Sequence, residues 1–80
     1  MAFGISISDP ATDEQVACSL QLSDQLIADA TAAIRHEGVT PELRERTERE
    51  LSYLSKLTKA APRHVDAITR RIGELTLLIA

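Results

Sequence analysis

The sequence predicts an all-α fold, a short bundle of three helical segments that follows a short extended N-terminal arm. Apolar side chains recur at steps of three and four residues in three separate stretches, which is the period of a helix with one buried face. Phe3 and Tyr53 are the only aromatic residues, so the core must come from aliphatic side chains, which suit slender helices. At 80 residues, the chain is expected to form one helical domain near the lower size at which a protein folds alone.

Residues 1–11 are the predicted arm. Phe3, Ile5 and Ile7 alternate with small residues, which is the period of a strand. Because a single strand is not stable alone, three arrangements stay open. The arm is a leader without fixed structure, a segment that lies on the helices, or an edge that pairs with a second copy or another protein.

The first helix is predicted over residues 13–37. Thr12 and Gln15 have the spacing of a capping box at its start, and Gly38 can adopt the left-handed conformation that ends a helix. A seven-residue repeat supplies its inward stripe: Val16, Leu20, Ser23, Ile27, Ala30 and Ile34. A break at Ser23-Asp24 is an alternative, because both residue types also cap helices.

The second helix is predicted over residues 41–60, with Thr40 as its N-cap and Pro41 at its first position. Two acid-before-base pairs at a spacing of four residues indicate a solvated face: Glu42 with Arg46, and Glu45 with Arg49. The inward stripe is Leu43, Thr47, Leu51, Leu54, Leu57 or Thr58, and Ala61.

Pro62 interrupts this pattern, because proline cannot donate a backbone hydrogen bond. A third helix is predicted over residues 63–79, with the inward stripe Val65, Ile68, Ile72, Leu75 and Ile79. Pro62 either reverses the chain to form a three-helix bundle, which we favour, or kinks the second arm of a hairpin. Gly73 costs this helix about 1 kcal/mol relative to Ala, which suggests a close approach by another backbone.

Charge is unevenly distributed along the chain. The net charge is −3, and all nine basic residues lie from Arg35 onward, whereas five of the twelve acidic residues precede it. We expect the acidic and basic halves to attract each other, either as two halves of one bundle or between antiparallel copies. The first arrangement is the simpler one and is favoured.

Apolar residues cover more of the surface of the last helix than a single buried face would account for. Leu75, Leu78 and Ile79 continue the inward stripe, but Leu77 projects about 200° away from Leu75. In the first helix, Leu22 and Leu26 form a second apolar edge. A symmetric dimer would bury both features, so the predicted protein interface is Leu75, Leu77, Leu78 and Ile79, then Leu22 and Leu26.

No residue constellation for catalysis, cofactor binding or metal binding is found. Cys18 is expected to be a buried structural thiol, because it lies mid-helix beside apolar neighbours. His36 and His64 are isolated near helix ends; His36 is expected to complement a helix C-terminus and His64 to face solvent. The chain is therefore predicted to be no enzyme and to carry no metal.

The cytoplasm is the expected location, since no secretory signal or membrane-length apolar run is found. A nucleic-acid-binding regulator is a lesser alternative. Five basic residues near Pro62 could form a modest patch, namely Lys56, Lys59, Arg63, Arg70 and Arg71, but the chain is acidic overall.

The favoured function is a small protein–protein interaction module: an adaptor, chaperone or inhibitor, acting as a homodimer or bound to a larger protein. Phage-encoded inhibitors of host proteins share this small size. The layout of the chain resembles that of type III secretion needle subunits and their co-chaperones in its length, its proline-containing turn and its apolar C-terminal helix. The sequence pattern of those families is absent, and the break at Pro62 departs from their unbroken second arm. That resemblance implies the alternative function, a structural assembly subunit or co-chaperone of a secretion-type apparatus.

Overall fold

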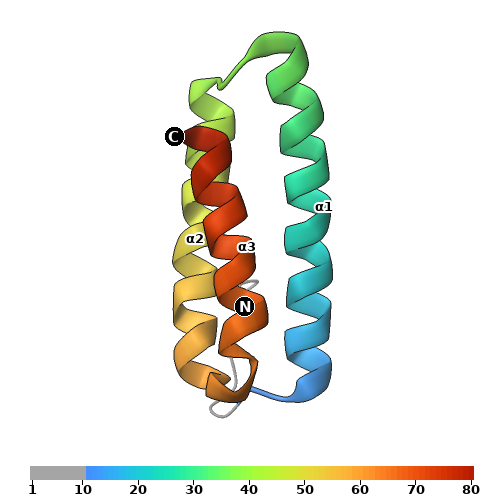
Figure 1. Ribbon diagram of the computed structural model, residues 1–80, viewed down its shortest axis with the longest axis vertical. Helices are drawn as coiled ribbons and strands as arrows, with labels where there is room; N and C mark the ends of the chain where they lie inside the picture. Colours follow the sequence, from blue (N-terminus) through green and yellow to red (C-terminus); the bar gives the residue numbers. More distant parts are fainter. Residues whose placement is uncertain (1–10) are drawn as a thin grey trace, which may run out of the picture.

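The computed structural model describes residues 11–80, which form three helices joined by short connections (Figure 1). Helix α1 spans Asp13–Glu37, α2 spans Pro41–Ala60 and α3 spans Val65–Ile79, and a 3₁₀ turn, η1, spans Pro62–His64. The predicted all-α bundle of three helical segments is confirmed. The arrangement predicted for the arm lies outside the described residues, apart from Ala11.

Two threonines and a glycine set the ends of α1 and the start of α2. The Oγ1 atoms of Thr12 and Thr40 each accept a hydrogen bond of 3.1 Å, from the backbone N–H groups of Gln15 and Leu43 respectively. Gly38 has a φ of 75° and donates its N–H to the carbonyl of Ile34, which closes the last turn. No break occurs at Ser23-Asp24, because α1 continues through these residues.

Pro62 reverses the chain rather than kinking a long arm. The N–H of Ala61 still donates to the carbonyl of Leu57, and the N–H of His64 then donates to the carbonyl of Ala61 across the 3₁₀ turn. As a result α3 returns antiparallel to α2 (Figure 1). It starts at Val65, two residues later than predicted, since the residues after proline are used to make the turn.

The core forms where α3 packs against both α1 and α2, whereas α1 and α2 contact each other less. Its largest fully buried apolar side chains are Leu54 and Leu57 of α2, Ile68 and Leu75 of α3, and Val16 of α1. Full burial of each such side chain is worth about 1.5–3 kcal/mol. Ala11 is also buried, and its N–H donates to the carbonyl of Ala60, so the chain is already packed before α1 begins.

The buried face of α1 contains Val16, Ser23 and Ala30 of the predicted stripe but is rotated slightly from it. Ser19 and Leu26 are buried where Leu20 and Ile27 were predicted, and these two lie at the margin of the core. Because of this rotation, Ser19 faces α2 along with Ser23, and their hydroxyl groups form hydrogen bonds with side chains of α2. On α3, the predicted stripe holds at Ile68, Leu75 and Ile79, but Val65 at its start is exposed.

The acidic and basic halves of the chain face each other within one bundle, as the charge distribution predicted. Arg71 of α3 donates two hydrogen bonds of 3.1 Å to the two carboxylate oxygens of Asp24 on α1. Arg63 of η1 lies 3.0 Å from a carboxylate oxygen of Asp13. Of the two ion pairs predicted on α2, the one between Glu45 and Arg49 is present.

Candidate protein-binding surfaces

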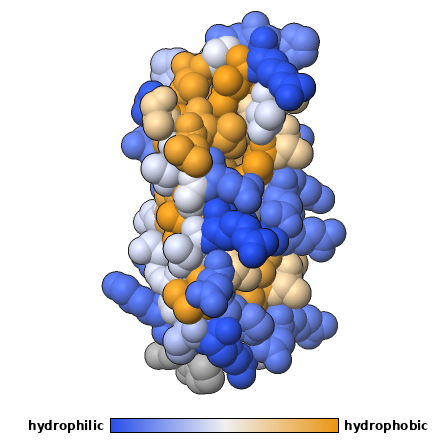
Figure 2. All heavy atoms as spheres, in the orientation of Figure 1, coloured by the Kyte–Doolittle hydropathy of each residue, from blue (hydrophilic) through white to orange (hydrophobic). Residues whose placement is uncertain are grey.

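Apolar side chains are left uncovered near the C-terminal end of α3. This helix has 15 residues and α1 has 25, so α3 is about 15 Å shorter and does not cover the whole length of the hairpin. Figure 2 shows apolar atoms gathered over the upper part of this side of the molecule. We call the two incompletely covered leucines of the last turn of α3 the end patch: Leu77, which is exposed, and Leu78, which is half-buried.

Leu77 is the most exposed large apolar side chain in the described part of the protein, at 79%. Leu75 is fully buried, and Leu77 is rotated from it by about 200° around α3, so it projects away from the bundle. Leu78 lies between them in exposure and packs against the margin of the core. The two positions therefore differ: Leu77 offers a free side chain, and Leu78 connects it to the core.

Three of the six predicted interface residues lie inside the bundle. Leu75 is 0% exposed, Leu26 is 6% exposed and Ile79 is 7% exposed. A partner could not reach Leu75 and Ile79 without separating the helices, and only a small part of Leu26 is exposed, in the wall of the groove described below. Sequence periodicity placed Leu75 and Ile79 on the inward stripe correctly, but it could not tell that α1 would rotate far enough to bury Leu26. The interface residues that remain available are Leu77, Leu78 and Leu22.

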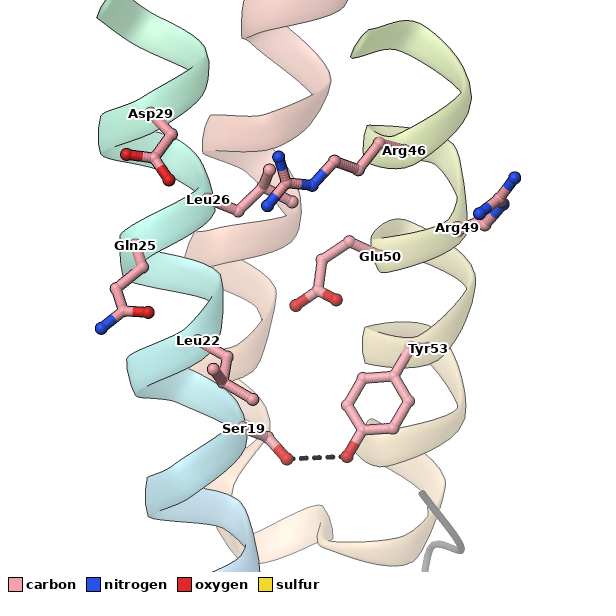
Figure 3. A pocket seen from close by; sticks show the side chains of 9 residues that line it. All are labelled: Ser19, Leu22, Gln25, Leu26, Asp29, Arg46, Arg49, Glu50 and Tyr53. Carbon is pink, nitrogen blue, oxygen red and sulfur yellow. Dashed lines mark hydrogen bonds between the residues drawn. The ribbon is translucent and has the colours of Figure 1, made fainter. Parts of the chain in front are cut away.

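A second surface is the groove between α1 and α2, on the side of the bundle away from α3. In Figure 3, α3 lies behind the groove, whereas it lies in front in Figure 1. The groove has a volume of about 440 Å³. It is lined by residues of both helices: Ser19, Leu22, Gln25, Leu26, Asp29, Arg46, Arg49, Glu50 and Tyr53. Leu22 is 48% exposed at its edge, so this groove has a free apolar side chain of its own.

Hydrogen bonds between side chains join α1 to α2 along this groove. The hydroxyls of Ser19 and Tyr53 lie 2.7 Å apart, and the hydroxyl of Ser23 donates to the carboxylate of Glu50 (Figure 3 draws the first of these). Sequence reasoning missed this feature. The available signal was a pair of serines four residues apart on an otherwise apolar helix face, because buried hydroxyls need a polar partner on the neighbouring helix.

Leu22 and Leu77 lie on opposite faces of the molecule. Leu22 borders a groove that has α3 on its far side (Figure 3), and Leu77 projects from the outer side of α3. The sequence predicted a single dimer contact that would bury Leu22 and Leu77 together. The fold separates them, because the rotation of α1 turns Leu22 toward α2 rather than toward α3.

Cys18 and His64 both differ from their predicted surroundings. Cys18 is exposed, so the prediction of a buried thiol is wrong; the rotation of α1 turns it outward. His64 is not isolated, because its Nε2 donates to Asp13 at 2.9 Å. This hydrogen bond and the charge of Arg63 lower the pKa of Asp13 below its ordinary value. The three residues connect the start of α1 to the turn after α2.

Within residues 11–80, no three His, Cys, Asp or Glu side chains are grouped as metal ligands. None of the helices in this range combines the length and the apolar character that crossing a membrane requires. No protein-family model matches the sequence, and neither a curated protein nor a solved structure matches it significantly.

Proposed function

We propose that this protein is a non-catalytic protein-binding module, an adaptor, chaperone or inhibitor that acts through the end patch. The observation that carries the proposal is the 79% exposure of Leu77 on a helix whose inner face is already buried. A single exposed leucine is ordinary on a protein surface. Leu77, however, is followed directly by the half-buried Leu78, so two incompletely covered leucines adjoin at the end of α3. A partner that covered Leu77 alone would gain about 1.5–3 kcal/mol.

The distribution of reactive groups supports a binding role over a catalytic one. In the described part of the chain, the histidine with side-chain partners is His64, and these partners hold α1 against the turn at Pro62. The exposed Cys18 lines a shallow hollow with Thr12, Gln15 and other residues of α1, and no histidine lines it. Nucleophilic catalysis needs a base within hydrogen-bond reach of the nucleophile.

A second candidate function is a structural assembly subunit of a secretion-type apparatus. It is favoured by one observation, the presence of free apolar side chains on opposite faces. Two different faces permit contacts that repeat from copy to copy, whereas a closed dimer uses one face twice. A nucleic-acid-binding regulator has less support, because Arg63 and Arg71 of the basic cluster are paired with Asp13 and Asp24. In each case we place the protein in the cytoplasm.

The test is a charge introduced at Leu77. The full chain is immobilised and used to capture proteins from the cell that produces it, and the mass of the free chain is measured by light scattering. We expect Leu77→Asp to lose the captured partner or the self-association, because a carboxylate replaces the apolar contact, while the helical content measured by circular dichroism is unchanged. Thr69→Asp, at an exposed position two turns earlier on α3, is the matched control and should bind normally. Normal binding by Leu77→Asp would exclude the end patch as the binding surface.

A further inference from the structure

We infer that residues 1–10 of the arm occupy the groove between α1 and α2 of their own chain, as an extended segment with Ile5 and Ile7 against Leu22 and Leu26. This selects the second of the three arrangements that the sequence left open, a segment that lies on the helices. The inference goes beyond the proposed function, because the groove and the end patch lie on opposite faces.

Ala11 fixes the point from which these residues depart. It is 1% exposed, its N–H donates to the carbonyl of Ala60 at 3.0 Å, and its own carbonyl accepts a hydrogen bond of 3.3 Å from Arg63. Both backbone groups of Ala11 are therefore used, and the segment before it starts from a fixed place beside the first turn of α1. A segment tethered next to a groove has a high effective concentration there.

A continuous track leads from this point into the groove. The shallow hollow that Cys18 lines begins at Thr12, the residue after Ala11, and extends along α1 to Ser19 and Leu22. Ser19 and Leu22 also line the groove. The hollow and the groove thus join end to end, and the track starts where the arm is attached.

The arm is long enough to follow this track. Ile7 lies five residues before Thr12, so an extended chain carries it about 17 Å from there, and Leu22 lies about 15 Å from Thr12 along α1. By the same measure Ile5 reaches about 23 Å, close to Leu26 at about 21 Å. Both isoleucines therefore reach the groove without stretching the chain beyond its ordinary length.

The apolar pattern of the arm matches the groove. In an extended chain, Ile5 and Ile7 lie on one side and Ser6 lies on the other. One apolar side therefore meets the groove and one small polar side remains for solvent. The groove offers apolar surface from both helices (Figure 3): Leu22, Leu26 and Tyr53.

The polar residues of the groove favour an extended occupant over a helix. A helix pairs most of its own N–H and C=O groups, whereas an extended segment needs partners for them. Polar side chains of both helices line the groove and supply such partners (Figure 3): Gln25, Asp29, Arg46 and Glu50. Residues 1–8 contain no ionisable side chain, so they add no acid to a groove that already holds two carboxylates.

The alternative is an arm that pairs with a second copy or with another protein and leaves the groove to solvent. The two arrangements differ in their dependence on concentration, because a contact within one chain persists on dilution. They also differ in what is left for a partner. An arm in the groove covers Leu22 and leaves Leu77 as the exposed apolar side chain of the opposite face.

NMR spectroscopy of the full chain tests the contact directly. We expect nuclear Overhauser contacts between the methyl groups of Ile5 or Ile7 and those of Leu22 or Leu26. These contacts should persist on dilution. In a mixture of isotope-enriched and ordinary chains, they should appear within one chain and not between two.

The thiol of Cys18 gives a second measurement, since it is the only cysteine of the chain and lies on the track. An arm that covers the track slows the reaction of Cys18 with a thiol reagent. We expect the double variant Ile5→Gln with Ile7→Gln to react about tenfold faster or more than the unaltered chain, because the apolar contacts that hold the arm are lost.

A matched control changes the other side of the arm. The double variant Ser6→Gln with Ser8→Gln introduces the same residue type at the alternate positions and should react at the rate of the unaltered chain. Leu22→Gln alters the groove instead of the arm and should raise the rate as the isoleucine variant does. Circular dichroism should show equal helicity in all of these variants.

Three results would overturn the inference. The first is the absence of methyl contacts between the arm and the groove, and the second is their presence only between different chains. The third is a Cys18 reaction rate that the isoleucine variant leaves unchanged.

These measurements do not depend on the end patch. Leu77→Asp should keep both the methyl contacts and the thiol rate, and the isoleucine variant should keep any partner that Leu77 binds. A failure of the inference therefore leaves the proposed function standing, and a failure of the proposed function leaves the inference standing.

Discussion

The hydroxyl groups of Ser19 and Tyr53 lie 2.7 Å apart and join α1 to α2 across a separation of 34 residues. Both side chains line the groove, so this hydrogen bond holds together two helices that contact each other little.

Removing this hydrogen bond should weaken the fold by a small, measurable amount. We expect Tyr53→Phe to lower the free energy of unfolding by about 0.5–1.5 kcal/mol, because a part-buried hydroxyl on Ser19 loses its partner. Urea denaturation of Tyr53→Phe, Ser19→Ala and the double variant measures the coupling between them. Additive effects in this cycle would show that the two hydroxyls do not interact in solution.

Gly73 should be replaceable by alanine with a gain in stability. The sequence suggested that another backbone approaches it closely, but the position is exposed and a Cβ would meet no atom within 4 Å. We therefore expect Gly73→Ala to stabilise α3 by about 1 kcal/mol and to raise the Tm by about 4–8 °C.

Gly38→Ala is the contrasting control, since its φ of 75° strains any residue with a Cβ. It should lower the Tm. A loss of stability in dilute Gly73→Ala would mean that the monomer uses the bare backbone at Gly73 after all.

Thr47 should tolerate valine better than alanine. Its side chain is fully buried in α2, and its Oγ1 has no hydrogen-bond partner. Because an unpaired buried hydroxyl costs about 1–3 kcal/mol, Thr47→Val, which keeps the shape, should leave the free energy of unfolding unchanged or raise it. Thr47→Ala should lower it, since a cavity remains. Thermal denaturation of the two variants side by side decides the point.

The ion pair of Asp13 should make stability depend on pH in the acid range. The hydrogen bond from His64 and the charge of Arg63 hold the pKa of Asp13 below its ordinary 3.8 in the folded protein. A group with a lowered folded pKa contributes stability above its unfolded pKa, and this contribution is lost as the pH falls through the folded value. Asp13→Asn should therefore flatten the fall in stability below about pH 4.

An NMR titration tests the cause directly. In His64→Gln, which removes the principal partner, the pKa of Asp13 should move up toward 3.8. An unchanged Asp13 pKa in that variant would assign the effect to Arg63 instead.

Much of the fold follows from local signals. Thr12, Thr40 and Gly38 mark helix ends because their side chains or backbone conformation satisfy groups that a helix leaves unpaired. These signals act within four residues, so one sequence suffices to find them. The inward stripe of α3 was likewise readable, since Ile68, Leu75 and Ile79 follow the period of the helix.

Only part of the candidate surfaces could be predicted from the sequence. Leu77 could be identified as outward once Leu75 was taken as inward, because both lie on one helix. The groove could not be identified from the sequence, since its lining depends on how α1 is rotated relative to α2. That turn buried Leu26, exposed Cys18 and brought Ser19 to Tyr53, over a separation that no periodic pattern reports.

The sequence by itself determined where α1 and α2 begin and end and that Leu77 points away from Leu75, because these properties are set by hydrogen bonds and angles within single helices. Only the tertiary structure decided that Pro62 reverses the chain and that Leu22 and Leu77 lie on opposite faces. Those outcomes depend on the rotation and packing of whole helices, and a seven-residue apolar pattern is compatible with more than one rotation.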